Sequence, residues 1–229
     1  MTSITLFGAS GRMGRAIAEV AADRDDISIV EDSAEVFIDF SAPEGLRDHL
    51  DQAVEAGQPI LVGTTGLKDE HHRLIDQAAA RIAVLQAANT SLGISLLAHL
   101  VRETAARLQE DWDIEIVEMH HRHKVDAPSG TALLLGAAAA EGRKADLDSV
   151  RRDGNDGKRR GGTIGFASLR GGSVTGDHMV VFAGEDERIE LGHRAESRAI
   201  FAEGAVKAAL WLVGKPAGRY TMGDVLGLT

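Results

Sequence analysis

The sequence lacks cysteine altogether and is poor in aromatic residues, with six Phe, two Trp and one Tyr. Without cysteine it has no disulfide, thiolate nucleophile or cysteine-ligated metal centre. The few aromatic residues and the net charge of −10 argue against a nucleic-acid-binding protein. No apolar run approaches the roughly 20 residues that span a bilayer, and the segment after Met1 shows no signal-peptide pattern. We therefore expect a cytoplasmic protein that binds neither nucleic acid nor membrane.

Short apolar runs alternate with helical patterns over residues 1–90. This alternation predicts a parallel, Rossmann-like, doubly wound α/β sheet. The runs are apolar throughout, as expected for strands that are covered on both faces. The expected strands are Ile4–Phe7, Ile27–Val30, Val36–Phe40, Ile60–Val62 and Ile82–Gln86, and the expected helices are Arg12–Arg24, a segment after Pro43, and Asp69–Ala80.

The pattern changes after Asn89 and predicts a second α+β domain with a mixed, largely antiparallel sheet. The expected helices are Leu92–Gln109 and Ser129–Glu141, and the expected strands are Asp113–Met119, Thr163–Arg170, Val174–Ala183 and Glu187–Glu196. Residues 151–162 are expected to form a Gly-rich charged loop. A last apolar helix, residues 200–213, is expected to pack on the first domain. The domains predicted in this way are residues 1–91 with 201–229, and residues 92–200.

A glycine-rich loop lies directly between the first expected strand and the first expected helix. It runs Gly8-Ala9-Ser10-Gly11-Arg12-Met13-Gly14, with G-x-x-G-x-x-G spacing instead of the commoner G-x-G-x-x-G. Glycines let peptide N–H groups approach a pyrophosphate at a helix N-terminus. Glycine spacing alone is weak evidence, and a tight turn without a ligand is the alternative. The position between strand and helix favours dinucleotide binding.

An acidic residue after the second strand commonly binds the adenosine ribose of NAD. Glu31 and Asp32 lie near that position, and an ordinary charged turn is the alternative. NADPH would favour a cation there, and none follows until Arg47, although Arg12 could face the phosphates. The choice between NADH and NADPH therefore stays open.

Two further polar segments follow expected parallel strands. Gly63-Thr64-Thr65-Gly66 comes after Ile60–Val62, and Asn89-Thr90-Ser91 comes after Ile82–Gln86. Open α/β sheets bind ligands at the carboxyl ends of their strands. The small and hydroxylated side chains leave room for a nicotinamide ring, with simple turn chemistry as the alternative.

The segment His120-His121-Arg122-His123-Lys124 concentrates cationic groups in an acidic protein. A metal site is disfavoured, because Arg122 and Lys124 would repel a divalent cation. A basic surface loop is the plainer alternative. Pro128 then introduces Ser129 and a helical pattern, which adds the positive end of a helix dipole beside the cations. The combination favours a small di-anion, especially a dicarboxylate, with a histidine as acid or base.

The stretch His120–Thr131, HHRHKVDAPSGT, is similar to the signature of the dihydrodipicolinate reductase family. Weaker matches run in the same order along nearly the whole chain: Gly8–Gly14, Phe37–Ser41, Gly63–Gly66, Ala87–Asn89 and Gly162–Phe166. The histidine signature is highly specific, whereas the other segments are individually modest.

The resemblance implies a reaction, a set of site residues and an assembly. The reaction is NADH- or NADPH-dependent reduction of 4-hydroxy-tetrahydrodipicolinate, a cyclic dicarboxylate of diaminopimelate and lysine biosynthesis, to tetrahydrodipicolinate. The implied catalytic residues are His120 and Lys124, the implied substrate contacts are His121, Gly130 and Thr131, and the implied dinucleotide contacts are Gly8, Ala9, Ser10, Gly11, Arg12, Met13, Gly63, Thr64, Thr65, Ala87, Ala88, Asn89 and Thr90. The resemblance also implies a homotetramer built on the sheet of the second domain.

Two features depart from the family pattern. Only Glu31–Glu35 join the second strand to the third, where the family has a longer stretch, so cofactor preference does not carry over. Thr90 stands where an aromatic residue is common. Another Rossmann-type dehydrogenase and a non-catalytic dinucleotide sensor are the alternative functions, and the sensor would leave the histidine cluster without a role.

Overall fold

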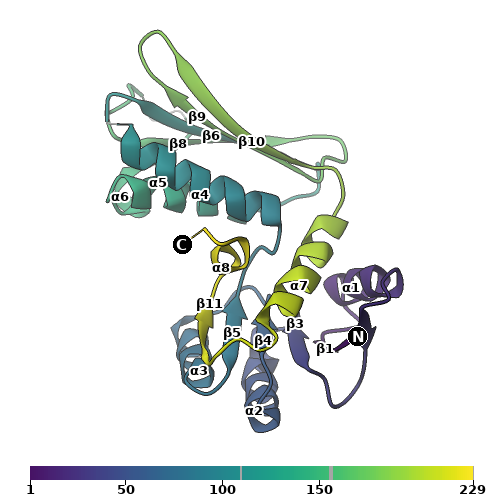
Figure 1. The fold of residues 1–229 in the computed structure, drawn as a ribbon. Coiled ribbons are helices and arrows are strands. Elements are labelled where there is room, and N and C mark those ends of the chain that lie inside the picture. Colours follow the sequence, from purple (N-terminus) through teal and green to yellow (C-terminus); the bar gives the residue numbers. More distant parts are fainter. Residues whose placement is uncertain (109, 155–156, 229) are drawn as a thin grey trace. The chain divides into compact units, whose positions relative to one another are not determined.

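The computed structural model describes residues 1–108, 110–154 and 157–228 (Figure 1). Contacts between these residues divide the chain into two compact units. Unit 1 consists of Met1–Leu92 and Ala199–Thr229, and unit 2 consists of Gly93–Arg198. Among the described residues, no helix has both the length and the apolar character needed to cross a membrane.

The sheet of unit 1 has six strands, all parallel, in the order β11-β5-β4-β3-β1-β2. The strands are β1 (Thr2–Phe7), β2 (Ile27–Ile29), β3 (Val36–Asp39), β4 (Ile60–Val62), β5 (Ala83–Gln86) and β11 (Gly218–Tyr220). The predicted parallel, doubly wound sheet is confirmed. Strands β2 and β3 pair with opposite sides of β1, so the strand order switches between β1 and β3. Sheets of this kind bind ligands at the carboxyl ends of the strands beside such a switch.

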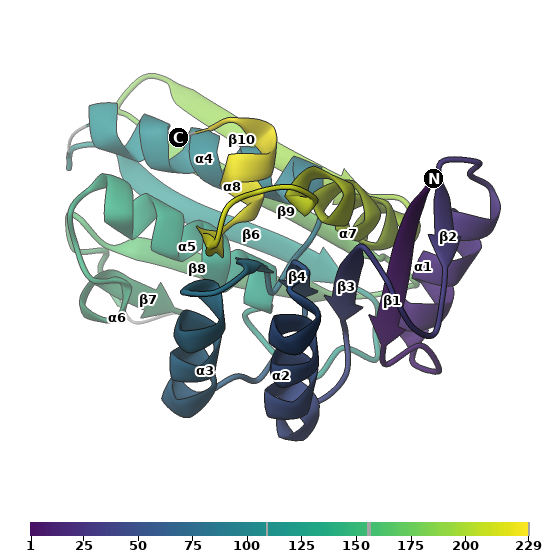
Figure 2. The ribbon, with the colours of Figure 1, turned by 60° about the horizontal axis from the view of Figure 1, so that its bottom comes forward.

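Helices cover both faces of this sheet (Figure 2). On β3, Val36 and Ile38 pack with the helices α1 (Arg12–Ala22) and α7 (Ala199–Leu212), whereas Phe37 packs with α2 (Leu46–Ala56) and α3 (Asp69–Ala79). Neighbouring strand residues thus enter opposite cores, which explains why the runs are apolar at every position. Each fully buried aliphatic side chain contributes roughly 1.5–3 kcal/mol of burial free energy.

The C-terminal part of unit 1 contains elements that the sequence patterns did not predict. Strand β11 and the short helix α8 (Met222–Leu226) follow α7, which itself packs on unit 1 as expected.

The N-terminal part of unit 1 differs from the prediction in small details. A 3₁₀ turn, η1 (Pro43–Gly45), precedes α2. Helix α1 ends at Ala22, two residues before the predicted end. Strand β2 forms a free edge of the sheet, because β3 pairs with the other side of β1.

The sheet of unit 2 is mixed, as predicted, with the order β10-β9-β6-β8-β7. Strands β9 and β10, and also β6 and β9, pair antiparallel, whereas β6 with β8 and β7 with β8 pair parallel. The strands are β6 (Asp113–His120), β7 (Arg151–Asp153), β8 (Ile164–Arg170), β9 (Gly176–Ala183) and β10 (Arg188–Ala195).

Within unit 2 the described helices lie along one face of the sheet: α4 (Leu92–Arg107), α5 (Gly130–Gly142) and α6 (Leu147–Val150) (Figure 1). Alternate residues of β6, such as Ile114 and Ile116, are fully buried beneath them, while those between are half-buried. The opposite face carries Val117, Met119 and Leu169, the last 51% exposed. This face therefore carries an apolar patch that no described helix of the unit covers.

The prediction of a loop over residues 151–162 is wrong for residues 151–153, which form a strand. Helix α6 and strand β7 occupy residues 147–153, and β7 adds to the sheet edge beside β8. The sequence of this strand, RRD, has no apolar residue, so no hydrophobic pattern indicates it. Only its backbone pairing with β8 defines it. Asn155 and Asp156 of the predicted loop, and Gln109 at the end of the predicted helix 92–109, lie outside the described residues; the described helix ends at Arg107.

Candidate active site

A cavity of about 440 Å³ lies at the carboxyl edge of the parallel sheet in unit 1. Eight of the residues proposed for the dinucleotide line it: Arg12, Met13, Gly63, Thr64, Thr65, Ala88, Asn89 and Thr90. Three more that the sequence patterns missed complete the lining: Phe40, Ser41 and Phe201. Phe40 and Ser41 follow β3, so their place at this edge could have been predicted, whereas Phe201 comes from the distant helix α7. The remaining candidates are the loop residues Gly8, Ala9, Ser10 and Gly11 and, at the end of β5, Ala87; none belongs to the cavity wall.

The glycine loop is held against the main chain after β3. Gly8 has φ = +82°, and a Cβ at this residue would lie 2.5 Å from the carbonyl oxygen of Phe40. Helix α1 then begins with Gly11 as its N-cap, and a glycine has no side chain that could accept a hydrogen bond from the first N–H groups. Uncapped N–H donors beside a cavity suit a phosphate. The loop therefore fits the pyrophosphate of a dinucleotide.

A buried carboxylate organises the cavity wall. Asp39, at the end of β3, is fully buried and accepts hydrogen bonds from Ser41 N (2.9 Å), Ser41 Oγ (2.6 Å) and Thr64 Oγ1 (3.0 Å). His49 Nδ1 of α2 lies 3.1 Å from the other carboxylate oxygen. These contacts fix two cavity-lining residues, Ser41 and Thr64, relative to each other.

Thr90, the departure from the family pattern, is buried and points toward α7. Its hydroxyl donates to the carbonyl of Phe201 at 2.6 Å. A Cβ at Gly204 would overlap the Thr90 carbonyl oxygen, so this glycine permits the close approach. Phe201 thus adds an aromatic side chain to the cavity wall beside Phe40, while Thr90 anchors the chain after β5.

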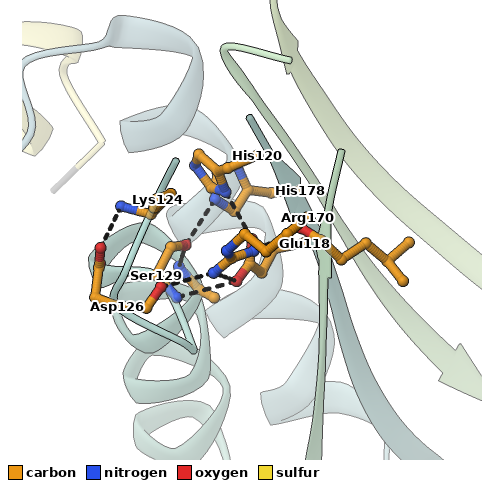
Figure 3. Close-up of polar contacts among 9 residues, drawn as sticks. Glu118, His120, Lys124, Asp126, Ser129, Arg170 and His178 are labelled. Atoms are coloured by element: carbon orange, nitrogen blue, oxygen red, sulfur yellow. Dashed lines mark hydrogen bonds and ion pairs between the residues drawn. The ribbon is translucent and has the colours of Figure 1, made fainter. Parts of the chain in front are cut away.

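In unit 2, His120 is the last residue of β6 and is 8% exposed. Its Nδ1 atom lies 2.6 Å from Oε2 of Glu118, two residues earlier on the same face of the strand (Figure 3). Glu118 also accepts two hydrogen bonds from Arg170 (2.8 and 2.7 Å) and one from the Ser129 backbone N–H (3.2 Å). Burial acts to raise the pKa of Glu118, but the hydrogen bonds from Arg170, Ser168 and His120 outweigh it and lower the pKa to about 2.

The helix that follows the histidine segment begins one residue after the predicted start and has a side-chain cap. Ser129 is the N-cap of α5, and its Oγ accepts from the Ala132 N–H at 3.1 Å. The same Oγ lies 3.0 Å from Nε2 of His178 on β9. Gly130 at the first helical position is exposed, and a Cβ there would meet open space. Gly130 and Thr131 thus begin a helix whose positive end lies next to the histidine segment in the chain.

The remaining cations of the segment lie in the turn after β6. Lys124 Nζ pairs with Asp126 at 2.9 Å, with the lysine side chain 22% exposed. The pKa of His121 is lowered, first by partial burial and then by the positive charges of Arg198, His123, His120 and Lys124. The turn therefore gathers positive charge without a matching number of carboxylates, which suits a doubly charged anion.

Three polar residues around His120 were not predicted as site residues: Glu118, Arg170 and His178. Glu118 could have been found, because strand alternation places it on the same face as His120. Arg170 and His178 lie on β8 and β9, and only the strand register brings them to His120 (Figure 3).

A glycine-rich strand–helix loop on a parallel sheet and a separate acid–base cluster define the class of two-unit, Rossmann-type oxidoreductases. The chain matches the family models for the C-terminus of dihydrodipicolinate reductase over residues 93–226 and for its N-terminus over residues 23–90. The chain belongs to the dihydrodipicolinate reductase family. Its activity is the NAD(P)H-dependent reduction of 4-hydroxy-tetrahydrodipicolinate to tetrahydrodipicolinate in diaminopimelate and lysine biosynthesis.

Curated relatives support this membership over the full chain. The 4-hydroxy-tetrahydrodipicolinate reductase of Zymomonas mobilis is 56% identical over 246 aligned positions, covering 98% of this chain and 97% of the relative. That of Caulobacter vibrioides is 46% identical and covers 98% and 96%. Both alignments exceed the 229 residues of this chain, so these relatives carry residues that it lacks.

Solved structures share the fold. A dipicolinate-bound dihydrodipicolinate reductase from Paenisporosarcina sp. TG-14 superposes with a TM-score of 0.78 at 20% identity, covering 96% of this chain and 97% of that chain. A probable dehydrogenase from Thermotoga maritima reaches a TM-score of 0.61 at 12% identity, covering 97% and 92%. The likeness extends across both units and therefore supports the Rossmann-like architecture.

Proposed function

We propose that His120 is the acid–base residue of the reduction. Its carboxylate partner accepts from Nδ1, so Nε2 is the ring atom that exchanges a proton with the substrate. An imidazole ionises near neutral pH, which suits proton transfer in both directions. The observation that carries this proposal is the buried Glu118–His120 pair at the end of β6.

We propose that Lys124, His121 and the first turn of α5 at Gly130 and Thr131 bind the two carboxylates of the substrate. The ammonium of Lys124 neutralises one negative charge and can deliver a proton, while the helix N-terminus supplies N–H donors. Dipicolinate, the molecule bound to the Paenisporosarcina reductase, is a planar dicarboxylate of the same kind. A planar dicarboxylate of this kind is therefore expected to inhibit this chain.

We propose that the nicotinamide dinucleotide binds the cavity of unit 1. Bound NADH or NADPH supplies the hydride. Arg12 and the N–H groups of the Gly8–Gly11 loop then neutralise and orient the pyrophosphate, and Thr64, Thr65 and Asn89 offer polar partners to the nicotinamide end. The wall residues Met13 and Phe201 exclude water from part of the cavity.

The test of this assignment is the rate of NADH oxidation with the product of the preceding synthase as substrate. His120→Gln should lower turnover by roughly a hundredfold or more, because positioned acid–base groups commonly supply about 10²–10⁴ in rate. The cofactor dissociation constant should stay near the wild-type value. Wild-type turnover in His120→Gln would remove this residue from the mechanism, and lack of inhibition by dipicolinate would weaken the proposed substrate site.

We propose a homotetramer assembled through the uncovered face of the unit 2 sheet. Val117, Met119 and Leu169 form an apolar patch on this face, and exposed apolar patches commonly mark interfaces. Leu169→Glu should lower the mass measured by analytical ultracentrifugation, whereas Val125→Glu, at a 96% exposed residue of the turn, should leave it unchanged. A tetramer that survives Leu169→Glu would argue against this face. The cytoplasmic location stays a prediction.

A further inference from the structure

The buried carboxylate of Glu118 holds the imidazole of His120 by its Nδ1 atom. Glu118 is 1% exposed, and its Oε2 lies 2.6 Å from Nδ1 (Figure 3). An ionised carboxylate only accepts hydrogen bonds, so Nδ1 must carry the proton. The Nε2 atom is then the basic nitrogen of the neutral ring. The contact therefore selects one tautomer, the one that leaves Nε2 available.

Arg170 holds that carboxylate in place from the neighbouring strand. Its two terminal nitrogens donate to the two oxygens of Glu118 at 2.8 and 2.7 Å, a bidentate geometry that fixes both position and orientation. The Ser129 backbone N–H adds a third anchor. The carboxylate thus has little freedom to rotate away from His120.

The same arginine reaches the turn that carries Lys124. One of its nitrogens donates to the carbonyl of Asp126 at 2.6 Å, and the Asp126 side chain pairs with Lys124 at 2.9 Å. The Glu118–Arg170 pair therefore joins the imidazole, the cationic turn and the start of α5 in one network. The pair contacts His120 directly and reaches Lys124 through Asp126.

We infer that Glu118 is a positioning residue of the reductase, which sets the tautomer and the orientation of the His120 ring, with Arg170 holding the carboxylate. This inference rests on the proposed role of His120. The ionisable groups that act on His120 are Glu118 on its own strand, Arg170 on β8, His178 on β9, and His121 and Lys124 in the turn. Glu118 is the carboxylate in direct contact with the ring, so its removal should dominate the change.

The test uses Glu118→Gln, which keeps the side-chain shape and removes the charge. We expect kcat to fall on the order of a hundredfold, with the cofactor KM unchanged. The loss of the carboxylate should also release the Nδ1–H tautomer of His120, because an amide can donate to Nδ1 as well as accept from it. Glu118→Asp, which restores the charge, should recover part of kcat and return the tautomer toward that of the wild type.

The matched control is Glu115→Gln, because Glu115 is another arginine-paired carboxylate of β6 but lies on the opposite face. It should leave kcat and the His120 tautomer unchanged. ¹⁵N NMR of the His120 ring gives a readout that does not depend on turnover: Nδ1–H in the wild type, and a mixture with Nε2–H in Glu118→Gln. A Glu118→Gln protein with a lower Tm but an unchanged tautomer would overturn the inference.

The two hypotheses fail in different ways. Wild-type turnover in His120→Gln would remove His120 from the mechanism and with it the basis for positioning. An impaired His120→Gln together with a wild-type His120 tautomer in Glu118→Gln would contradict the positioning role alone.

Discussion

The imidazole rings of His120 and His178 meet edge to face, with their centroids 5.1 Å apart and their planes at 74°. His178 is 5% exposed, and burial, followed by the charge of His120, lowers its pKa to about 4. His178 is therefore neutral at neutral pH and does not compete with His120 for positive charge. In this pair His120 is the ring proposed for proton exchange, and His178 is its neutral neighbour.

The lowered pKa of His178 predicts a pH-dependent stability. The unfolded chain protonates this histidine near its ordinary pKa of about 6.5, whereas the folded chain resists protonation until about pH 4. His178 thus contributes stability above pH 6.5 that is lost as the pH falls toward 4, at most roughly 3 kcal/mol. Urea unfolding between pH 7 and 5 should show this slope in the wild type and a flatter one in His178→Gln. The exposed His123→Gln should keep the wild-type slope; an unchanged slope in His178→Gln would refute the prediction.

Lys124 should contribute to both affinity and turnover. Lys124→Ala removes a positive charge from the proposed dicarboxylate site, so kcat should fall and the substrate KM should rise, each by roughly tenfold or more. Lys124→Arg keeps the charge but changes the geometry, so it should preserve KM better than kcat. Steady-state kinetics at constant ionic strength measures both. Wild-type values for Lys124→Ala would exclude the lysine from the site.

Gly63 and Phe40 should be coupled in the cofactor cavity. A Cβ at Gly63 would overlap the Phe40 ring, so Gly63→Ala should push this ring toward the cavity and weaken cofactor binding by roughly tenfold. Phe40→Ala should relieve the clash, so the double variant should bind better than the sum of the single effects predicts. Titration of NADH fluorescence measures the four dissociation constants. Additive effects would show that the ring does not transmit the clash.

The connection after β2 should favour NADH over NADPH. Glu31 and Asp32 follow β2 and are both exposed, and an anionic side chain at this position repels a 2′-phosphate while it can bind a ribose hydroxyl. We expect a higher kcat/KM for NADH, and Asp32→Arg should shift the ratio toward NADPH by roughly tenfold. Asp25→Arg, in the turn that precedes β2, is the matched control. Equal ratios in wild type and Asp32→Arg would place the ribose elsewhere.

The sequence patterns predicted the parallel sheet well, because strands that are covered on both faces are apolar at every position. They missed β7 and β11, which are three residues long and whose sequences, RRD and GRY, have no apolar period. Such strands exist because a neighbouring strand offers its backbone groups, and that partner is set by tertiary structure.

The candidate site was predictable where chemistry is concentrated in the sequence. His120, Lys124 and the α5 N-cap stand within ten residues of one another, so their clustering is visible in the amino-acid sequence alone. Arg170 and Phe201 lie far along the chain from the groups they contact. Arginines are common in this sequence, and nothing local distinguishes Arg170 from the others.

The edge position of β2 shortens one side of the proposed dinucleotide site. On this side of the sheet, β2 is the last strand after β1. The chain then returns from Ile29 to Val36 over a short connection. Among the described residues, the sheet has no strand beyond β2. We therefore expect the proposed site to hold the cofactor mainly by its phosphates and nicotinamide, and we expect analogues altered in the purine to be accepted with little penalty.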